Sequence, residues 1–241
     1  MAASFLSKFR AWPAQSPGQS KEPQYQDAFE LAAKQGLTSL GLMTNQVWHD
    51  DPRRLAIVLA RYKFVAKMLS GSRRVLEVGC ADAFGTRIVQ QEVGAVTALD
   101  FDPAFIADIE RRKDPSWPME TALHDMLDGP FGRDFDAAYS LDVLEHVEAS
   151  SETAFVGNLA GSLRQNGVLI IGTPSLSSQA HASPASKEGH VNCKSAESLK
   201  GLLQGFFQNV FIFSMNDEVV HTGFYPMAHY YFALCCAPKK R

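Results

Sequence analysis

The 241-residue sequence contains no run of 18 apolar residues, so it predicts no membrane-spanning helix and no membrane partner. Cysteine is scarce and forms no CxxC pair, which argues against a disulfide framework or a zinc ribbon and favours the reducing cytoplasm. The four cysteines are Cys80, Cys193, Cys235 and Cys236. Positive charge is not in excess, because the net charge is −3, so broad binding to nucleic acid is not expected.

The N-terminal segment also lacks a continuous apolar stretch, so residues 1–24 do not predict a secretory signal. We expect them to be flexible. Residues 25–48 look helical in part. We therefore predict a partly flexible N-terminal extension over residues 1–50, acting as a cap, and a main domain over residues 51–241.

The main domain alternates helix and strand patterns, which is typical of a mostly parallel sheet with helices on both faces. A first helix is predicted from residue 52 to residue 69. Strands are expected at 73–79, 95–100, 119–124, 134–140, 167–173, 209–215 and 229–237, and further helices at 83–93, 103–112, 151–164 and 195–206. No helix separates the last two strands, so the last strand of this seven-stranded sheet should be antiparallel.

The most specific segment is VLEVGCADAFGT at residues 75–86, which reads as a strand, a tight turn and a helix start. Ligands of open parallel sheets bind beyond the carboxyl ends of the strands, where Gly79 leaves room for close approach. The segment departs from the dinucleotide pattern GxGxxG, since Ala81 and Phe84 replace the second and third glycines. Glu77 and Asp82 would repel a pyrophosphate, by about 4 kcal/mol for a contact at about 4 Å, whereas they suit the cationic S-adenosylmethionine (SAM).

This segment resembles motif I of the class I SAM-dependent methyltransferases, whose usual form is [V/I]L[E/D]xGxGxG. Later segments agree in order and spacing, so the resemblance covers roughly residues 52–237. It implies a Rossmann-like α/β fold, SAM as cofactor and S-adenosylhomocysteine (SAH) as product. Ala81 and Ala83 stand where glycines are usual, and we expect binding to survive if their φ angles are negative.

The resemblance also implies the cofactor-binding residues. Asp100 would accept bonds from both ribose hydroxyls, although it could instead cap the next helix, a role that Asp102 could fill. Asp125 would accept from the adenine amino group, or be only an exposed loop acid. The complete set is Glu77, Gly79, Cys80, Ala81, Asp100, Phe101, Asp125, Met126, Ser140 and Leu141.

On the acceptor side, methyl transfer needs alignment and, for a hydroxyl nucleophile, a general base. Histidines gather in the loops after the later strands, and His146, His190 and His221 are the candidate bases in that order. Each has an ordinary structural alternative, namely a bond to local backbone, a satisfied loop histidine, or a hairpin cap. The possible ligands of a divalent ion (His49, Asp50, Asp51, His146, His190, His221) show no compact spacing, so no metal is predicted.

We therefore expect a SAM-dependent methyltransferase that moves a methyl group to an oxygen or nitrogen of a small-molecule acceptor by in-line displacement. The alternatives are a catalytically inactive methyltransferase-like binding subunit, a methyltransferase acting on a macromolecule and, last, an NAD-dependent reductase. The sequence leaves the acceptor and the oligomeric state open.

Overall fold

The computed structural model describes residues 20–239, and the chain divides into two compact units between Leu40 and Gly41. The described part of the first unit contains the 3-10 helix η1 (Pro23–Tyr25) and helix α1 (Gln26–Gln35). Flexibility of residues 1–19 is an expectation that lies outside the described residues. Residues 41–50 belong to the second unit, and a capping role for residues 1–50 stays a prediction.

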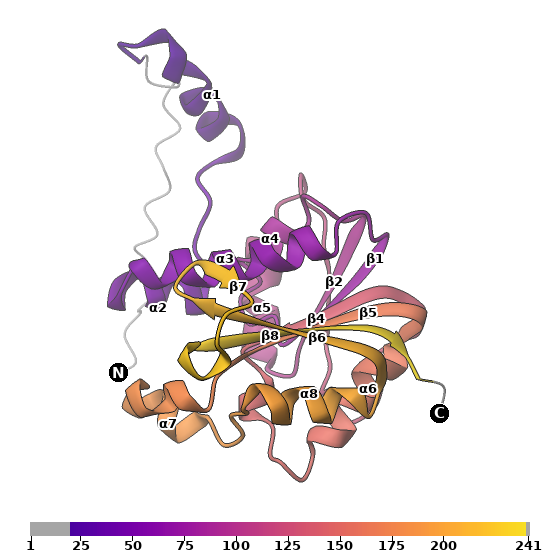
Figure 1. Cartoon of the computed structure of the whole chain (residues 1–241). Helices are drawn as coiled ribbons and strands as arrows, with labels where there is room; N and C mark the ends of the chain where they lie inside the picture. The colour runs from indigo at the N-terminus through magenta and orange to yellow at the C-terminus, as the bar shows by residue number, and fades with distance from the viewer. Residues whose placement is uncertain (1–19, 240–241) are drawn as a thin grey trace, which may run out of the picture. The chain divides into compact units, whose positions relative to one another are not determined.

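The second unit alternates strands and helices, as the sequence pattern predicted (Figure 1). Its strands are β1 (Arg74–Val78), β2 (Ala95–Asp100), β3 (Glu120–Leu123), β4 (Phe135–Leu141), β5 (Leu163–Pro174), β6 (Phe207–Asn216), β7 (Val219–His221) and β8 (Tyr230–Pro238). Its α-helices are α2 (Leu42–Asp50), α3 (Arg53–Met68), α4 (Thr86–Val89), α5 (Pro103–Arg112), α6 (Glu152–Ser162), α7 (Pro184–Gly189) and α8 (Ala196–Gln204). The 3-10 helices are η2 (Leu144–His146), η3 (Ser177–His181) and η4 (Tyr225–Met227). No helix within residues 20–239 combines the length and apolar character needed to cross a bilayer.

The strands of the described chain form one eight-stranded sheet in the order β3-β2-β1-β4-β5-β8-β6-β7. Strands β1 to β5 pair in parallel, so their carboxyl ends meet at one edge, and the chain order reverses between β1 and β4. Strand β8 runs antiparallel between β5 and β6, which confirms the expected direction of the last strand. Ligands of such sheets bind beside the point of reversal.

The prediction of seven strands was wrong by one. The additional strand is β7, whose three residues pair antiparallel with β6 at the sheet edge. Asp217 adopts a positive φ of 49° in the two-residue turn that joins Asn216 to Val219. Three residues are too few to show an alternating pattern, so the sequence carries no signal for this strand.

The helix predicted over residues 83–93 is also much shorter, since α4 covers only Thr86–Val89. The Glu92 carbonyl accepts from the Gly71 N–H and the Gly94 N–H donates to the Ser72 carbonyl, both at 2.9 Å. These bonds hold the segment after α4 against the entry to β1. The chain therefore turns back to β2 instead of continuing the helix.

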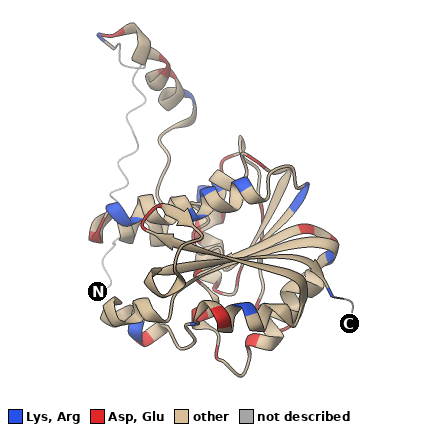
Figure 2. Cartoon of the chain, in the orientation of Figure 1, with Lys and Arg blue, Asp and Glu red and all other residues tan. Residues whose placement is uncertain are grey.

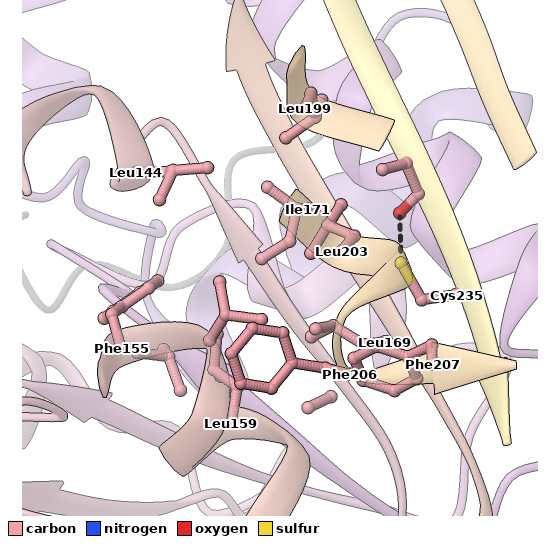
Figure 3. Packing of buried hydrophobic residues seen from close by; sticks show 14 of the residues in the cluster. Leu144, Phe155, Leu159, Leu169, Ile171, Leu199, Leu203, Phe206, Phe207 and Cys235 are labelled. Atoms are coloured by element: carbon pink, nitrogen blue, oxygen red, sulfur yellow. Dashed lines mark hydrogen bonds between the residues drawn. The ribbon is translucent and has the colours of Figure 1, made fainter. Parts of the chain in front are cut away.

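Two apolar clusters cover the two faces of the sheet. Along β5, Leu169 and Ile171 face one cluster and Ile170 faces the other, as strand alternation requires. Helices α6 and α8 supply the first cluster, and α3 and α4 supply the second. Figure 3 shows the first cluster, with Phe155 and Leu159 of α6 and Leu199 and Leu203 of α8 packed on the sheet. Charged residues lie mainly on the helices and connecting segments (Figure 2).

Candidate functional site

The turn after β1 is tied to the end of β2. The backbone N–H groups of Gly79 and Cys80 both donate to the Leu99 carbonyl at 2.9 Å. Gly79 has a φ of 76°, and a side chain there would collide with Val143, so glycine is required. Cys80 is 1% exposed, and burial raises the pKa of its thiol, so it contributes packing and turn backbone.

The condition that we attached to Ala81 and Ala83 is not met, because their φ angles are positive, at 46° and 52°. Alanine pays about 1–2 kcal/mol for this conformation, in which glycine is unstrained. Bonds within the site hold both residues: the Ala81 N–H donates to Asp100 Oδ2, and the Ala83 N–H donates to the Cys80 carbonyl, each at 2.8 Å. The turn thus has positive φ angles at the positions of the second and third glycines of motif I, although alanines stand there.

Glu77 points into the fold beneath this turn. It is 2% exposed, and its Oε2 accepts from Thr86 Oγ1 at 2.5 Å. Burial raises the pKa of Glu77 to about 7, with Thr86, Tyr139 and Tyr62 opposing that rise. Direct contact of this carboxylate with a cationic ligand stays a prediction.

Asp82 has a structural role that the sequence did not reveal. Its Oδ2 accepts from the Thr44 N–H at 2.7 Å in the first turn of α2, and Asp108 Oδ2 accepts from the Leu42 N–H at 3.2 Å. A side chain on Gly41 would collide with Asp82, so the backbone must approach closely here. Two carboxylates thus cap α2 and fix it beside the turn after β1.

Asp100 ends β2 and faces the same turn. Its two oxygens accept from the backbone N–H groups of Ala81 at 2.8 Å and Asp102 at 2.9 Å. Asp102 caps α5 by accepting from the Ala104 N–H, so the capping alternative belongs to Asp102. Asp100 is 6% exposed and burial raises its pKa, whereas the following Phe101 is 72% exposed.

Asp125 and Met126 lie after β3. Asp125 is exposed, and its Oδ1 accepts from the Leu127 N–H at 2.8 Å. The Met126 side chain is 3% exposed in the first apolar cluster, and its carbonyl accepts from Asn158 Nδ2 at 2.8 Å. Side-chain packing therefore fixes the Met126 backbone at this end of the sheet.

The residues predicted at the end of β4 are both buried. Ser140 is 1% exposed, and its hydroxyl donates to the Val78 carbonyl at 2.9 Å, which ties β4 to β1. Leu141 is 7% exposed and packs in the second apolar cluster. Their side chains thus hold the end of β4 in the sheet and the core, and contact with a methionyl group stays a prediction.

Arg61 is a candidate residue that the sequence reasoning missed. It lies on α3, and its Nη1 donates to both oxygens of Asp142, at 2.7 and 2.6 Å. Its guanidinium stacks on the Tyr230 ring at 3.8 Å from the centroid, and its side chain is 15% exposed. A signal was present in the sequence, because Arg61 lies three residues after Val58 and four before Val65 and is therefore a charged residue on the apolar stripe of its helix.

The structure brings His146 and His190 together, with ring centroids 5.0 Å apart. His146 Nδ1 lies 2.8 Å from the Gly189 carbonyl, and His190 Nδ1 lies 2.9 Å from Gln179 Oε1. Because both oxygens are acceptors, each Nδ1 carries the hydrogen and each neutral ring keeps a lone pair on Nε2. Burial, followed by the nearby His146, lowers the pKa of His190, which favours the neutral form.

Glu145 lies buried beside this pair. It is 1% exposed, its Oε2 accepts from Thr173 Oγ1 at 3.0 Å, and burial raises its pKa to about 8. One potential ligand atom from each of Glu145, His146 and His190 lies within 4.8 Å of the others.

Among the described residues, His221 is not part of the group formed by Glu145, His146 and His190. Its Nε2 bonds to Asn216 Oδ1 at 2.8 Å, and its Nδ1 accepts from the Gly223 N–H at 2.9 Å. Both ring nitrogens are thus engaged in its own hairpin. His49, Asp50 and Asp51 also lie outside the group.

Comparisons with known proteins give matches to part of the chain. Residues 76–171 match the sequence model of a family described as a methyltransferase domain. A probable S-adenosylmethionine-dependent methyltransferase of Mycolicibacterium smegmatis is 28% identical over 136 residues, which are 56% of this chain. The matched part spans about half (48%) of that relative's length.

Solved methyltransferase structures are similar to this chain in fold. The N-methyltransferase NodS of Bradyrhizobium japonicum, in complex with SAH, is 21% identical with a TM-score of 0.58, over 80% of this chain and 91% of that chain. The sugar N-methyltransferase KedS8 of a Streptoalloteichus species is 16% identical with a TM-score of 0.57, over 83% of this chain and 95% of that chain. At these identities the similarity shows the fold alone.

Proposed function

We propose that this protein transfers the methyl group of SAM to an oxygen or nitrogen of a small-molecule acceptor. The proposal is supported by the match of residues 76–171 to a methyltransferase domain and by the similarity of the fold to an N-methyltransferase in complex with SAH. SAH is then the second product. The names of NodS and KedS8, both N-methyltransferases and the latter acting on a sugar, support an acceptor of this class.

The observation that carries the proposal is the set of buried carboxylates at the carboxyl ends of β1 and β2. Burial raises the pKa of Glu77 and of Asp100, so their charged forms are disfavoured without a nearby cation. The ammonium and sulfonium of SAM supply that positive charge, whereas a phosphate would add to the repulsion. These carboxylates therefore fit the cationic SAM better than the phosphates of a dinucleotide.

Each group of the cofactor has a suitable partner among these residues. Asp100 holds two backbone N–H groups and keeps further lone pairs for the ribose hydroxyls. Phe101 presents an exposed ring, and Asp125 an exposed carboxylate, for the adenine end. Arg61 offers a permanent positive charge for the methionyl carboxylate, in partial exchange for Asp142.

When bound, SAM supplies an electrophilic methyl group on a good leaving group, so the protein mainly has to align the acceptor. Alignment can contribute about 7–11 kcal/mol, and a base adds about 10²–10⁴-fold for a hydroxyl acceptor. We place the acceptor beside His146 and His190, because their Nε2 lone pairs can receive its proton. His221 has both nitrogens engaged and is the weakest of the predicted bases.

Calorimetric titration with SAH and, separately, with NAD tests the cofactor assignment. We expect micromolar binding of SAH and no binding of NAD. Preference for NAD would refute the methyltransferase proposal. Binding of neither ligand would refute the assignment of SAM as the cofactor.

Transfer of a labelled methyl group from SAM to a panel of phenols, amines, sugars and carboxylates tests the reaction. With an acceptor found, His146→Ala should lower turnover far more than SAH affinity. His181→Ala is the matched control, since His181 is an exposed histidine of the same acceptor-side loops. Intact turnover of His146→Ala would exclude it as a base, and labelling of RNA or protein instead would refute the small-molecule assignment.

A further inference from the structure

The group formed by Glu145, His146 and His190 has a composition that a general base alone does not need. Two imidazoles and one carboxylate present ligand atoms within 4.8 Å of one another. Glu145 and His146 belong to η2, which follows β4, and His190 directly follows α7, which explains why no compact HxxxH spacing appears in the sequence. We propose that these three residues bind one divalent transition-metal ion.

The first argument is the orientation of the two rings. His146 and His190 each direct Nδ1 to an oxygen, the Gly189 carbonyl and Gln179 Oε1. Gln179 is itself oriented, because its Nε2 donates to the Ser175 carbonyl at 3.4 Å. Metal-binding histidines usually have this second bond, which fixes the tautomer and directs the other nitrogen at the ion. Neither Nε2 has a hydrogen-bond partner among residues 20–239.

The second argument is the position of the carboxylate. Glu145 is 1% exposed, and Thr173 holds one of its oxygens at 3.0 Å. His146 is exposed and His190 partly exposed, so the buried carboxylate forms the floor and the rings form the open side. Bond lengths of about 2.0–2.2 Å place tetrahedral ligand atoms about 3.3 Å apart, so atoms that now lie within 4.8 Å of one another would move closer together when the ion binds.

Ligand chemistry selects the ion. Imidazole favours zinc, iron, nickel and copper over magnesium and calcium, which prefer sets made only of oxygen. Three protein ligands leave at least one position open, as in catalytic zinc sites. Resting on the proposed function, the open position would take the acceptor oxygen or nitrogen, and the positive charge of the ion would lower the pKa of that atom. The ion would then occupy the Nε2 lone pairs, so in the metal-bound protein the acceptor proton would go to solvent and not to His146 or His190.

Titration of tag-free, metal-stripped protein with Co²⁺, in the absence of SAM, tests the site directly. We expect one ion per chain with the visible absorption of a low-coordinate Co²⁺ site, and displacement by Zn²⁺. His190→Gln and His146→Gln should each weaken binding more than about 100-fold, since even loss of an outer partner of a ligand costs about 10–100-fold. Gln179→Ala removes the outer partner of His190 and should weaken Co²⁺ binding by about 10–100-fold.

The controls are His181→Gln and Glu148→Gln, which change exposed residues close in sequence to the ligands and should bind Co²⁺ as the wild type does. Glu145→Gln alters a buried group, so its fold is checked by circular dichroism before its affinity is compared. Absence of Co²⁺ binding to the wild type, or wild-type affinity in both histidine variants, would overturn the proposal. Because SAH binding is measured separately, failure of the metal site and failure of the methyltransferase assignment are distinguishable.

Discussion

Glu77 should make the protein less stable as the pH rises through neutrality. It is 2% exposed, and burial raises its pKa from 4.5 to about 7 in the folded chain. A raised folded-state pKa contributes stability that is complete below the unfolded value and is lost as the pH passes the folded value. The window for this loss therefore runs from about pH 4.5 to about pH 7.

The magnitude follows from the same pKa change. At about 1.4 kcal/mol per pKa unit, moving from 4.5 to about 7 corresponds to about 3 kcal/mol. Glu77→Gln keeps an oxygen that can accept from Thr86 and removes the titration. We expect the variant to match the wild type near pH 4.5 and to be more stable by about 3 kcal/mol at pH 8.

Urea unfolding of both proteins at several pH values between 4.5 and 8 measures this difference. Glu145 also has a raised pKa, but it titrates in both proteins and cancels in the comparison. Glu148→Gln, which changes an exposed glutamate, should follow the wild-type curve. Parallel stability curves for Glu77→Gln and the wild type would refute the reasoning.

Further expected outcomes concern the turn and its supports. Asp100→Ala should weaken SAH binding by about 1.5–3 kcal/mol by calorimetry, because it removes a charged hydrogen-bond acceptor, and an unchanged affinity would show that Asp100 does not touch the ribose. Ala81→Gly should raise the free energy of unfolding by about 0.5 kcal/mol, since relief of the strain of the positive φ exceeds the entropy cost of glycine. As a control, Ala107→Gly at an exposed position of α5 should lower the free energy of unfolding by about 1 kcal/mol. A loss of stability in Ala81→Gly would contradict the strain. Asp82→Ala should cost about 1–3 kcal/mol and speed amide hydrogen exchange in α2 before the rest of the chain, and uniform exchange would argue against the cap.

The local pattern of the chain was sufficient for most of the fold. Strand β2 and helix α5 were predicted at their observed ends, because AVTALD has β-branched and apolar residues and Pro103 follows a capping aspartate. The antiparallel last strand was also predicted, because no helix pattern separates the last two strands, whereas the reversal of strand order appeared only in the structure. The shortened α4 did not, because bonds from Glu92 and Gly94 to the residues before β1 decide where that helix ends.

The sequence by itself determined most of the elements, the acidic residues near the ends of the first two strands and the family that the chain resembles, since these depend on periodicity and on residue type at fixed spacing. Only the tertiary structure decided what each polar side chain faces. It turned Asp82 to the start of α2, engaged both nitrogens of His221, and brought Arg61 to Asp142 and His146 to His190. The reason is that such pairings join residues tens of positions apart, and their geometry depends on how helices and loops pack at the sheet edge, which no local pattern encodes.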